Sequence, residues 1–290
     1  MFYMTIKDYF KKAQKEKWAI GQFNISNLET LRAIVKAAQN LKSPVIIGTS
    51  EGESKFMGPG EVVALVASFR KEYGLPIFLN LDHGKNFDYI KEVIDLGYDA
   101  VHFDGSELSL EENIKTAKKV VEYGHKKKVF VEGEVGIIDG ASEILKNIPE
   151  IKEENFTKPE EALKFVKETK VDSLAINVGT LHGMGVLKKD PNINLNRLKE
   201  IKEKVGGKAF LVLHGGSGTQ EEDIRKAIEL GIVKININTE LRAAFTDTLE
   251  KSMKEKPEEI TPYKYFPEVI DAVQKIVEDK IKLFGSDNKL

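Results

Sequence analysis

Three of the five histidines in this 290-residue chain directly follow short apolar runs of the kind that form buried strands. They are His83 in NLDHG, His182 in NVGTLHG and His214 in LVLHGG, and each is followed by glycine. Three imidazole nitrogens with a fourth position left open form the ligand pattern of a catalytic zinc site. A lone histidine is more often structural, but three at matching positions argue against coincidence. His102, inside a strand run, and His125, at a helix end, are interpreted as structural.

A candidate anion site lies next to the third of these histidines, in the segment FLVLHGGSG at 210–218. Its glycines let backbone N–H groups converge on one point, and the helical pattern that follows adds a helix N-terminus. The loops after the seventh and eighth strands of a barrel often bind phosphate. The candidate groups are Gly215, Gly216, Ser217, Asn236, Asn238 and Thr239. The alternatives are a plain turn and simple helix capping before Glu240.

Carboxylates occupy the same strand ends. Asp82 precedes the first histidine, and Asp104 closes the run HFD. Glu132 and Glu134 alternate in FVEGEVG, so they share one face of a strand. Asp104 could instead cap the next helix. Several carboxylates beside three histidines favour a metal centre with an acid or base next to it.

A metal ion, a phosphate pocket and a carboxylate together suit proton abstraction next to a carbonyl group. The metal polarises the carbonyl, and the carboxylate takes the proton. Schiff-base chemistry would require a lysine at the C-terminal end of a strand. Lys234 instead opens the last strand run, and Lys85 lies in a loop.

Apolar runs alternate with amphipathic helical patterns along the whole chain. The predicted strands are Ala19–Ile25, Pro44–Thr49, Pro76–Leu81, Ala100–Phe103, Val129–Val135, Ser173–Val178, Ala209–Leu213 and Val233–Ile237. The predicted helices are Asn27–Leu41, Gly60–Tyr73, Phe87–Leu96, Leu110–Lys126, Pro159–Lys170, Leu195–Val205, Glu221–Leu230 and Glu240–Lys254. Eight such repeats predict a closed (β/α)8 barrel, the TIM barrel, as a single α/β domain over 1–290. A doubly wound open sheet is the competing architecture.

Two links are much longer than the others, 136–158 and 179–194. Both follow strand C-terminal ends, where barrel enzymes carry out chemistry, and we predict that they are active-site loops. The segment 261–290 carries a helical pattern over Glu268–Phe284 and is predicted to be a C-terminal helical extension that packs outside the barrel or against a partner subunit.

Composition narrows the classes of function. Lys and Arg number 44 and Asp and Glu 46, so the net charge of −2 does not favour binding to nucleic acid or to an anionic membrane. Cysteine is absent, and neither a signal peptide nor an apolar run near twenty residues is visible. These features predict a cytoplasmic protein.

The motifs together resemble the class II, zinc-dependent fructose-bisphosphate and tagatose-bisphosphate aldolase family. The resemblance includes SPVIIGTSEG, NLDHG, VEGEVG, VDSLAINVGTLHG, LVLHGGSG and KININTE, and it covers nearly the whole chain. It implies a (β/α)8 barrel, usually dimeric or tetrameric. It also implies the reversible cleavage of a ketose bisphosphate to dihydroxyacetone phosphate and an aldehyde through a metal-stabilised enediolate.

The resemblance implies roles for individual residues. The zinc ligands would be His83, His182 and His214, and Asp104 and Glu134 would bind a second or displaced divalent metal. Asp82 matches the acid that handles the proton of the C4 hydroxyl. The substrate-binding groups would be Asn24, Ser50, Gly183, Gly215, Gly216, Ser217, Asn236, Asn238 and Thr239. Ser50 matches the side of the distal phosphate, and a monovalent cation, Na⁺ or K⁺, would sit near the proximal phosphate.

The chain departs from the family pattern at four places. Met184, Gly185 and Val186 replace an aromatic residue and a lysine, for which Lys188 or Lys189 could substitute. The family base follows Gly-Gly-Glu, whereas this chain reads DGASE at 139–143, so Glu143 is the candidate for the C3 base. The Asp-Pro-Arg of the distal phosphate appears as TPYK at 261–264, and Asn238 replaces an aspartate.

The predicted function is that of a zinc-dependent aldolase that cleaves fructose 1,6-bisphosphate to dihydroxyacetone phosphate and glyceraldehyde 3-phosphate. Its catalytic residues would be Asp82 and Glu143, and the chain would form a homodimer or homotetramer. A tagatose bisphosphate or a ketose monophosphate is the alternative substrate. A metal-dependent hydrolase and a non-catalytic sugar-phosphate sensor on the same barrel are the alternatives from other classes.

Overall fold

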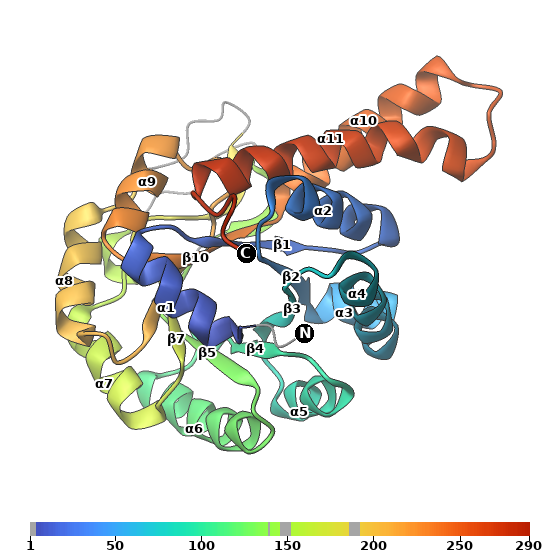
Figure 1. Ribbon diagram of the computed structural model, residues 1–290. Helices are drawn as coiled ribbons and strands as arrows, with labels where there is room; N and C mark the ends of the chain where they lie inside the picture. The colour runs from blue at the N-terminus through green and yellow to red at the C-terminus, as the bar shows by residue number, and fades with distance from the viewer. Residues whose placement is uncertain (1–3, 139, 146–151, 186–191) are drawn as a thin grey trace.

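The computed structural model describes residues 4–138, 140–145, 152–185 and 192–290. Within these ranges eight parallel strands close into a barrel in the order β1, β10, β9, β7, β5, β4, β3, β2 (Figure 1). They are β1 (Ile20–Asn24), β2 (Val45–Ser50), β3 (Ile77–Gly84), β4 (Ala100–Phe103), β5 (Phe130–Val135), β7 (Ser173–Ile176), β9 (Phe210–Leu213) and β10 (Ile232–Ile237). The predicted barrel is confirmed, and the open-sheet alternative is wrong.

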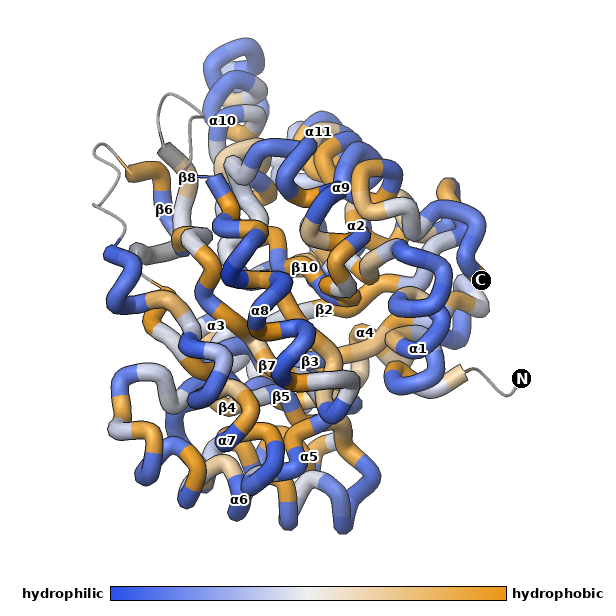
Figure 2. Tube along the Cα trace, turned by 90° about the vertical axis from the view of Figure 1, so that its left-hand side faces the viewer, coloured by the Kyte–Doolittle hydropathy of each residue, from blue (hydrophilic) through white to orange (hydrophobic). Residues whose placement is uncertain are grey.

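Helices surround the barrel at the positions that the apolar periodicity predicts. They are α2 (Leu28–Leu41), α4 (Pro59–Tyr73), α5 (Phe87–Leu96), α6 (Leu110–Lys126), α7 (Pro159–Thr169), α8 (Leu195–Val205), α9 (Glu221–Glu229) and α10 (Thr239–Glu255). Figure 2 shows hydrophobic residues along the barrel strands and mixed hydrophobic and hydrophilic residues along these helices. The helices α2 and α4 to α9 therefore bury apolar residues on one side. In α10 the only buried apolar residue is Leu241.

Strand β3 extends further than the apolar run that predicts it. The run ends at Leu81, but the pairing with β2 continues to Ser50 and Asp82. His83 and Gly84 also belong to β3, and the register with β4 shifts between Leu81 and Gly84. The prediction that His83 follows the strand is therefore corrected: the backbone ladder continues after the apolar residues end, and it holds the imidazole within the strand.

The helix α1 (Ile6–Glu16) is an element that the sequence analysis does not predict. It packs against the N-terminal ends of the barrel strands through a separate apolar cluster. Phe10 is fully buried at its centre, and its ring makes edge contacts with Phe130 and Phe210 at centroid distances of 5.2 and 5.5 Å. The end of the barrel opposite the predicted chemistry is thus closed by α1.

Both long links contain regular structure. A short strand in each, β6 (Gly140–Leu145) and β8 (His182–Gly185), pairs with the other in a separate two-stranded sheet. The 3₁₀ helix η1 (Glu153–Asn155) lies in the first link, and α3 (Glu51–Met57) follows β2 directly. The backbone register places Gly140 opposite His182.

The predicted C-terminal helix is present as α11 (Pro262–Leu283) and begins earlier than its apolar pattern. It packs against α2 and α10, and Figure 1 shows the α10–α11 hairpin projecting beyond the barrel. Among the described residues, no helix combines the length and the apolar character needed to cross a bilayer.

We predict that Phe10→Ala destabilises the protein by about 3 to 5 kcal/mol, because a large ring leaves a fully buried site. Urea unfolding followed by circular dichroism measures the change. Phe56→Ala is the matched control, since Phe56 is 81% exposed. An equal effect of the two substitutions would contradict the packing role of α1.

Candidate active site

The C-terminal ends of the barrel strands surround a small polar pocket. Each residue that lines it is a predicted site residue: Asn24, Asp82, His83, His182, Gly183, His214, Gly215, Ser217, Asn236, Asn238 and Thr239. A larger cavity, of about 690 Å³, opens beside α1 at the other end of the barrel and shares none of these residues. The sequence prediction therefore coincides with one pocket at the expected end of the fold.

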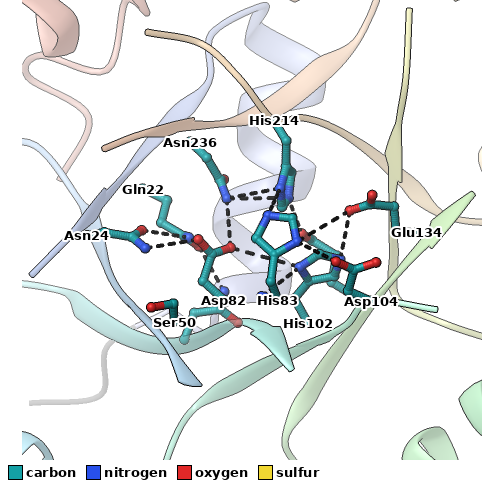
Figure 3. A network of polar contacts seen from close by, with 12 residues as sticks. Gln22, Asn24, Ser50, Asp82, His83, His102, Asp104, Glu134, His214 and Asn236 are labelled. Atoms are coloured by element: carbon teal, nitrogen blue, oxygen red, sulfur yellow. Dashed lines mark hydrogen bonds and ion pairs between the residues drawn. The ribbon is translucent and has the colours of Figure 1, made fainter. Parts of the chain in front are cut away.

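His83 is held by contacts on both sides of its ring. Its backbone has the left-handed conformation, with φ of 52°, which is uncommon for a residue other than glycine. The backbone N–H donates to His102 Nδ1 at 3.1 Å. Nδ1 of His83 contacts Asp104 Oδ2 at 2.8 Å, and its Nε2 lies 3.0 Å from His214 Nδ1 (Figure 3).

His182 reaches the same pocket from the small sheet. Its ring centroid lies 4.7 Å from that of His83 and 6.2 Å from that of His214. A side chain at Gly140 would place its Cβ 2.1 Å from the carbonyl oxygen of His182, so the close approach of β6 to β8 requires glycine. The structure therefore places the three predicted zinc ligands around one pocket, but His182 belongs to neither of the two compact ligand groups found among the described residues.

Two compact groups of potential metal ligands occur among the described residues, each with its atoms within 4.8 Å of one another. One consists of Asp82, His83, His102 and His214, and the other of His83, Asp104 and Glu134. The second group contains both predicted ligands of the additional divalent metal. His83 is common to the two groups and therefore connects the two candidate metal positions.

His102, interpreted above as structural, lies inside this cluster and is fully buried. Its Nε2 forms an ion pair of 3.2 Å with Glu134 Oε2, although the geometry is not that of a hydrogen bond. Its Nδ1 lies 3.9 Å from Asp82 Oδ1. The signal for this position was the two-residue spacing between His102 on β4 and Asp104 just after the strand, which favours the same side for both side chains.

The donor atoms fit a divalent metal such as zinc. The facing nitrogens of His83 and His214 each belong to a ring whose other nitrogen contacts a carboxylate, of Asp104 at 2.8 Å and of Glu132 at 2.9 Å. A histidine that donates to a carboxylate on one side presents a lone pair on the other. The buried Glu134 Oε2 has no hydrogen-bond partner in the described part of the chain, and a cation would compensate it.

Asp82 is oriented by two amides. Its Oδ2 accepts from Asn24 Nδ2 at 2.9 Å, and its Oδ1 accepts from Asn236 Nδ2 at 3.0 Å (Figure 3). Burial alone would raise the pKa of Asp82, but the neighbouring His83 and His102 outweigh burial and hold that pKa well below its usual value. Asp82 is therefore held as a buried, ionised carboxylate whose two oxygens accept hydrogen bonds from fixed amides.

The surroundings shift the pKa values of two buried histidines in opposite directions. Burial, together with His83 and His214, lowers the pKa of His182 to about 3, so its ring is neutral and can bind a metal. Burial also opposes the cation of His102, but the carboxylates of Asp82 and Glu134 outweigh it and raise the pKa of His102 to about 10. Nδ1 of His102 accepts from the backbone N–H of His83, however, and a hydrogen bond to this nitrogen requires the neutral ring.

The loop after β9 contains Gly215 and Gly216, and at both positions a side chain would clash with neighbouring residues. Gly215 has a φ of 67°, and a Cβ there would lie 2.2 Å from the carbonyl oxygen of Leu181. The N–H of Gly216 donates to the carbonyl of Asn236 at 3.1 Å, and a Cβ at Gly216 would lie 2.6 Å from the Ile235 side chain. Gly215 therefore sets the position of the residue before His182.

The N-terminus of α10 borders the pocket beside this loop. The helix begins at Thr239, and the side chain of Asn238 makes no capping hydrogen bond. Glu240 accepts from the N–H of Gly218 at 2.8 Å, which ties the loop to the helix. Ser217 and Thr239 line the pocket at this point. The combination of loop and helix N-terminus fits an anion such as phosphate.

Other predicted residues lie outside the pocket lining. Ser50 is the N-cap of α3, and its N–H donates to Glu53 Oε2 at 2.8 Å. Glu143 lies on β6 with an exposed side chain. Asp104, Glu134 and Gly216 lie behind the lining residues. Lys188 and Lys189, the alternatives for phosphate binding, fall outside the described residues.

Three residues of the surrounding network were not among the predicted site residues. Glu53 Oε1 contacts Arg242 Nη2 at 2.5 Å, and its Oε2 accepts from Asn24 Nδ2 at 3.1 Å. Lys234 points into the barrel and contacts Glu132. The capping-box spacing from Ser50 to Glu53 signals α3, and the two-residue spacing from Lys234 to Asn236 signals a shared strand face.

A closed parallel barrel with a polar pocket at the C-terminal ends of its strands is the architecture of a (β/α)8 barrel enzyme. The sequence model of the family "Fructose-bisphosphate aldolase class-II" matches residues 4–289. The chain belongs to the class II fructose-bisphosphate aldolase family. Membership implies a lyase, and it favours that interpretation over the hydrolase alternative.

Solved structures of other proteins agree with this assignment. The YdjI aldolase from Escherichia coli K12 is 31% identical, with 99% of each chain covered and a TM-score of 0.83. Fructose-bisphosphate aldolase from Campylobacter jejuni is 22% identical, with 99% of this chain and 96% of that chain covered and a TM-score of 0.84. The second likeness is evidence for the fold alone.

We predict that Gly215→Ala weakens binding of dihydroxyacetone phosphate about 10-fold or more, because the new Cβ displaces the binding loop and the backbone before His182. Isothermal titration calorimetry measures the affinity. Gly60→Ala is the matched control, since no atom lies within 4 Å of a Cβ built there and its φ is ordinary. Unchanged affinity in Gly215→Ala would exclude this loop from the phosphate site.

Proposed function

We propose that the chain is a zinc-dependent aldolase that reversibly cleaves fructose 1,6-bisphosphate to dihydroxyacetone phosphate and glyceraldehyde 3-phosphate through an enediolate. The observation that carries the proposal is the convergence of His83, His182 and His214 with an oriented Asp82 and an anion-binding loop in one pocket. Family membership supports the reaction class.

The proximal phosphate of the ketose would bind where the glycine loop meets α10. Backbone N–H groups at a helix N-terminus favour an anion, and Ser217 and Thr239 add hydroxyl donors at the same place. A phosphate fixed there would extend the sugar chain toward the histidines. Gly183 and Asn238 line the space between these groups.

His83, His182 and His214 would hold the catalytic zinc ion, and Asp104 and Glu134 a second divalent position. Zinc, when bound, would supply polarisation of the ketose carbonyl. The chain itself contributes the orientation of the imidazoles, through the carboxylate contacts behind His83 and His214. It also contributes burial, which strengthens electrostatic interactions with the reacting atoms.

The proton transfers would be divided between two carboxylates. Asp82 would take the proton of the C4 hydroxyl during cleavage and return it during synthesis, since Asn24 and Asn236 orient its two oxygens. Glu143 would remove the C3 proton of dihydroxyacetone phosphate in the synthetic direction. Its strand β6 pairs with the strand of His182, which supports a position near the pocket.

Other features of the proposal follow from the family resemblance. They are a monovalent cation, Na⁺ or K⁺, near the proximal phosphate and a homodimer or homotetramer. The cytoplasmic location proposed here rests on composition instead. The α10–α11 hairpin, which projects from the barrel, offers a surface for a partner subunit (Figure 1). Size-exclusion chromatography with light scattering would determine the oligomer.

We predict that the zinc-loaded protein exchanges a C3 proton of dihydroxyacetone phosphate with deuterated water, as followed by NMR, and that chelation stops the exchange. This experiment needs no aldehyde partner. Glu143→Gln should slow exchange on the order of 100-fold or more, the effect of a lost general base. His83→Ala should lose both bound zinc and exchange.

Outcomes that contradict this prediction are distinct. Exchange at the wild-type rate in Glu143→Gln would assign the base to another group. Absence of exchange in wild-type protein that holds zinc and binds dihydroxyacetone phosphate would favour the non-catalytic sensor. Glu154→Gln is a control for carboxylate loss, because Glu154 is exposed on η1 in the same link.

A second candidate is a ketose monophosphate whose aldehyde product carries no phosphate, and the Glu53–Arg242 ion pair favours it. A cavity of about 280 Å³ beside the pocket shares Asn24 and Asn238 with it and is lined by both members of the pair. Glu53 is 7% exposed, and its carboxylate offsets the charge with which Arg242 would attract a distal phosphate. A neutral hydroxyl end of the sugar suits this environment better.

The ratio of kcat/KM for fructose 1,6-bisphosphate to that for fructose 1-phosphate decides between the two candidates. If Glu53 disfavours the distal phosphate, Glu53→Gln should raise this ratio about 10-fold or more, since juxtaposed like charges cost several kcal/mol. Glu51→Gln, in the same helix, should leave it unchanged. A wild-type ratio well above one that Glu53→Gln does not change would support the bisphosphate.

A further inference from the structure

A buried ion pair crosses the barrel interior beneath the pocket. Lys234 Nζ lies 2.9 Å from each carboxylate oxygen of Glu132, and both side chains are 3% exposed. Lys234 belongs to β10 and Glu132 to β5, and β9 and β7 lie between these strands in the barrel. Ser173 Oγ on β7 donates to Glu132 Oε2 at 2.9 Å. The carboxylate is therefore held by donors from two other strands.

Stability does not account for this pair. Moving two charges out of water costs several kcal/mol per ion, and apolar side chains of similar volume often stabilise a core equally well. Most of the barrel interior around the strand starts is apolar in this way, as in the cluster beneath α1. We therefore expect the charged pair to have another role, namely a contact with a third group that two apolar side chains could not make.

That contact is with His214. Its Nε2 lies 2.9 Å from Glu132 Oε1, the same oxygen that accepts from Lys234. A carboxylate paired with an ammonium group can only accept, so Nε2 must carry the proton. The other nitrogen, Nδ1, then presents its lone pair, and it is this atom that faces His83 Nε2 at 3.0 Å.

The amide of Asn236 also contacts the His214 ring, but it does not determine which ring nitrogen carries the proton. Asn236 Nδ2 lies 3.3 Å from Nε2 and 3.5 Å from Nδ1 of His214, so it contacts both nitrogens almost equally. Glu132 is the carboxylate that contacts one nitrogen of His214 and not the other, so it places the proton on Nε2. Lys234 binds both oxygens of Glu132, which fixes the plane of the carboxylate and hence the direction of its contact with His214.

We propose that Lys234 and Glu132 are positioning residues that hold His214 as the Nε2–H tautomer, with its Nδ1 lone pair directed to the metal position. Neither residue needs to touch the metal or the substrate. The inference deepens the proposed zinc site and rests on it for the metal readout, whereas the tautomer can be measured in the metal-free protein.

The first test is zinc affinity, measured by competition with a chromogenic chelator. Lys234→Met and Glu132→Gln should each bind zinc about 10- to 100-fold more weakly, the usual effect of losing a partner that orients a metal-bound histidine. The double variant Lys234→Met with Glu132→Met replaces the pair by apolar side chains, which keeps the core filled. It should fold and still bind zinc weakly, which separates positioning from structural support.

The second test is the tautomer of His214 in metal-free protein labelled with ¹⁵N in histidine. Long-range ¹H–¹⁵N correlation spectra should show Nε2–H for the wild type and a mixture of tautomers for Lys234→Met. Arg70→Met is the control, because it removes the Arg70–Asp99 ion pair at the opposite end of the barrel. It should change neither the tautomer nor zinc affinity.

The outcomes separate the two proposals. Wild-type zinc affinity and an unchanged tautomer in folded Lys234→Met would overturn the positioning role. A wild-type protein without zinc affinity would overturn the proposed metal site, and the tautomer in Lys234→Met would still decide the positioning role. Weakened zinc binding with an unchanged tautomer would also contradict the inference, since the effect would then arise elsewhere.

Discussion

The site depends on contacts between imidazole rings and carboxylates. Each carboxylate contacts the ring nitrogen that points away from the other imidazole. Asp104 contacts one nitrogen of His83 and Glu132 one nitrogen of His214, while the opposite nitrogens meet at 3.0 Å. These contacts determine which nitrogen of each ring faces the other ring. The carboxylates lie on or directly after different strands of the barrel than the histidines they contact. The site can therefore form only when the sheet closes.

The architecture and most of the pocket could be predicted from sequence because both depend on short-range patterns. Apolar runs at regular intervals indicate strands, and polar residues at the strand ends meet when the sheet closes. Residues such as His83 and Gly215 could be predicted from the residues immediately next to them in the sequence. The resemblance to a family then assigned roles that spacing alone would have left open.

The features that sequence analysis did not predict depend on partners far away in the chain. Lys234 and Glu132 are 102 positions apart, and Arg242 and Glu53 are 189 apart, so no local pattern joins them. His83 is held in a left-handed conformation by His102, a contact between neighbouring strands. Helix α1 has an amphipathic pattern in the sequence. It was not predicted because it precedes the first strand and is not part of the strand–helix repeat.

The pairing of β6 with β8 has a mechanical consequence. Gly140 lies against the backbone of His182, and the candidate base Glu143 is carried three residues further on the same strand. The candidate metal ligand and the candidate base thus belong to one small sheet that is separate from the barrel. Because the backbones of β6 and β8 are paired, the position of Glu143 depends on that of His182, so the proposed metal site and the proposed base would be placed by one structural unit.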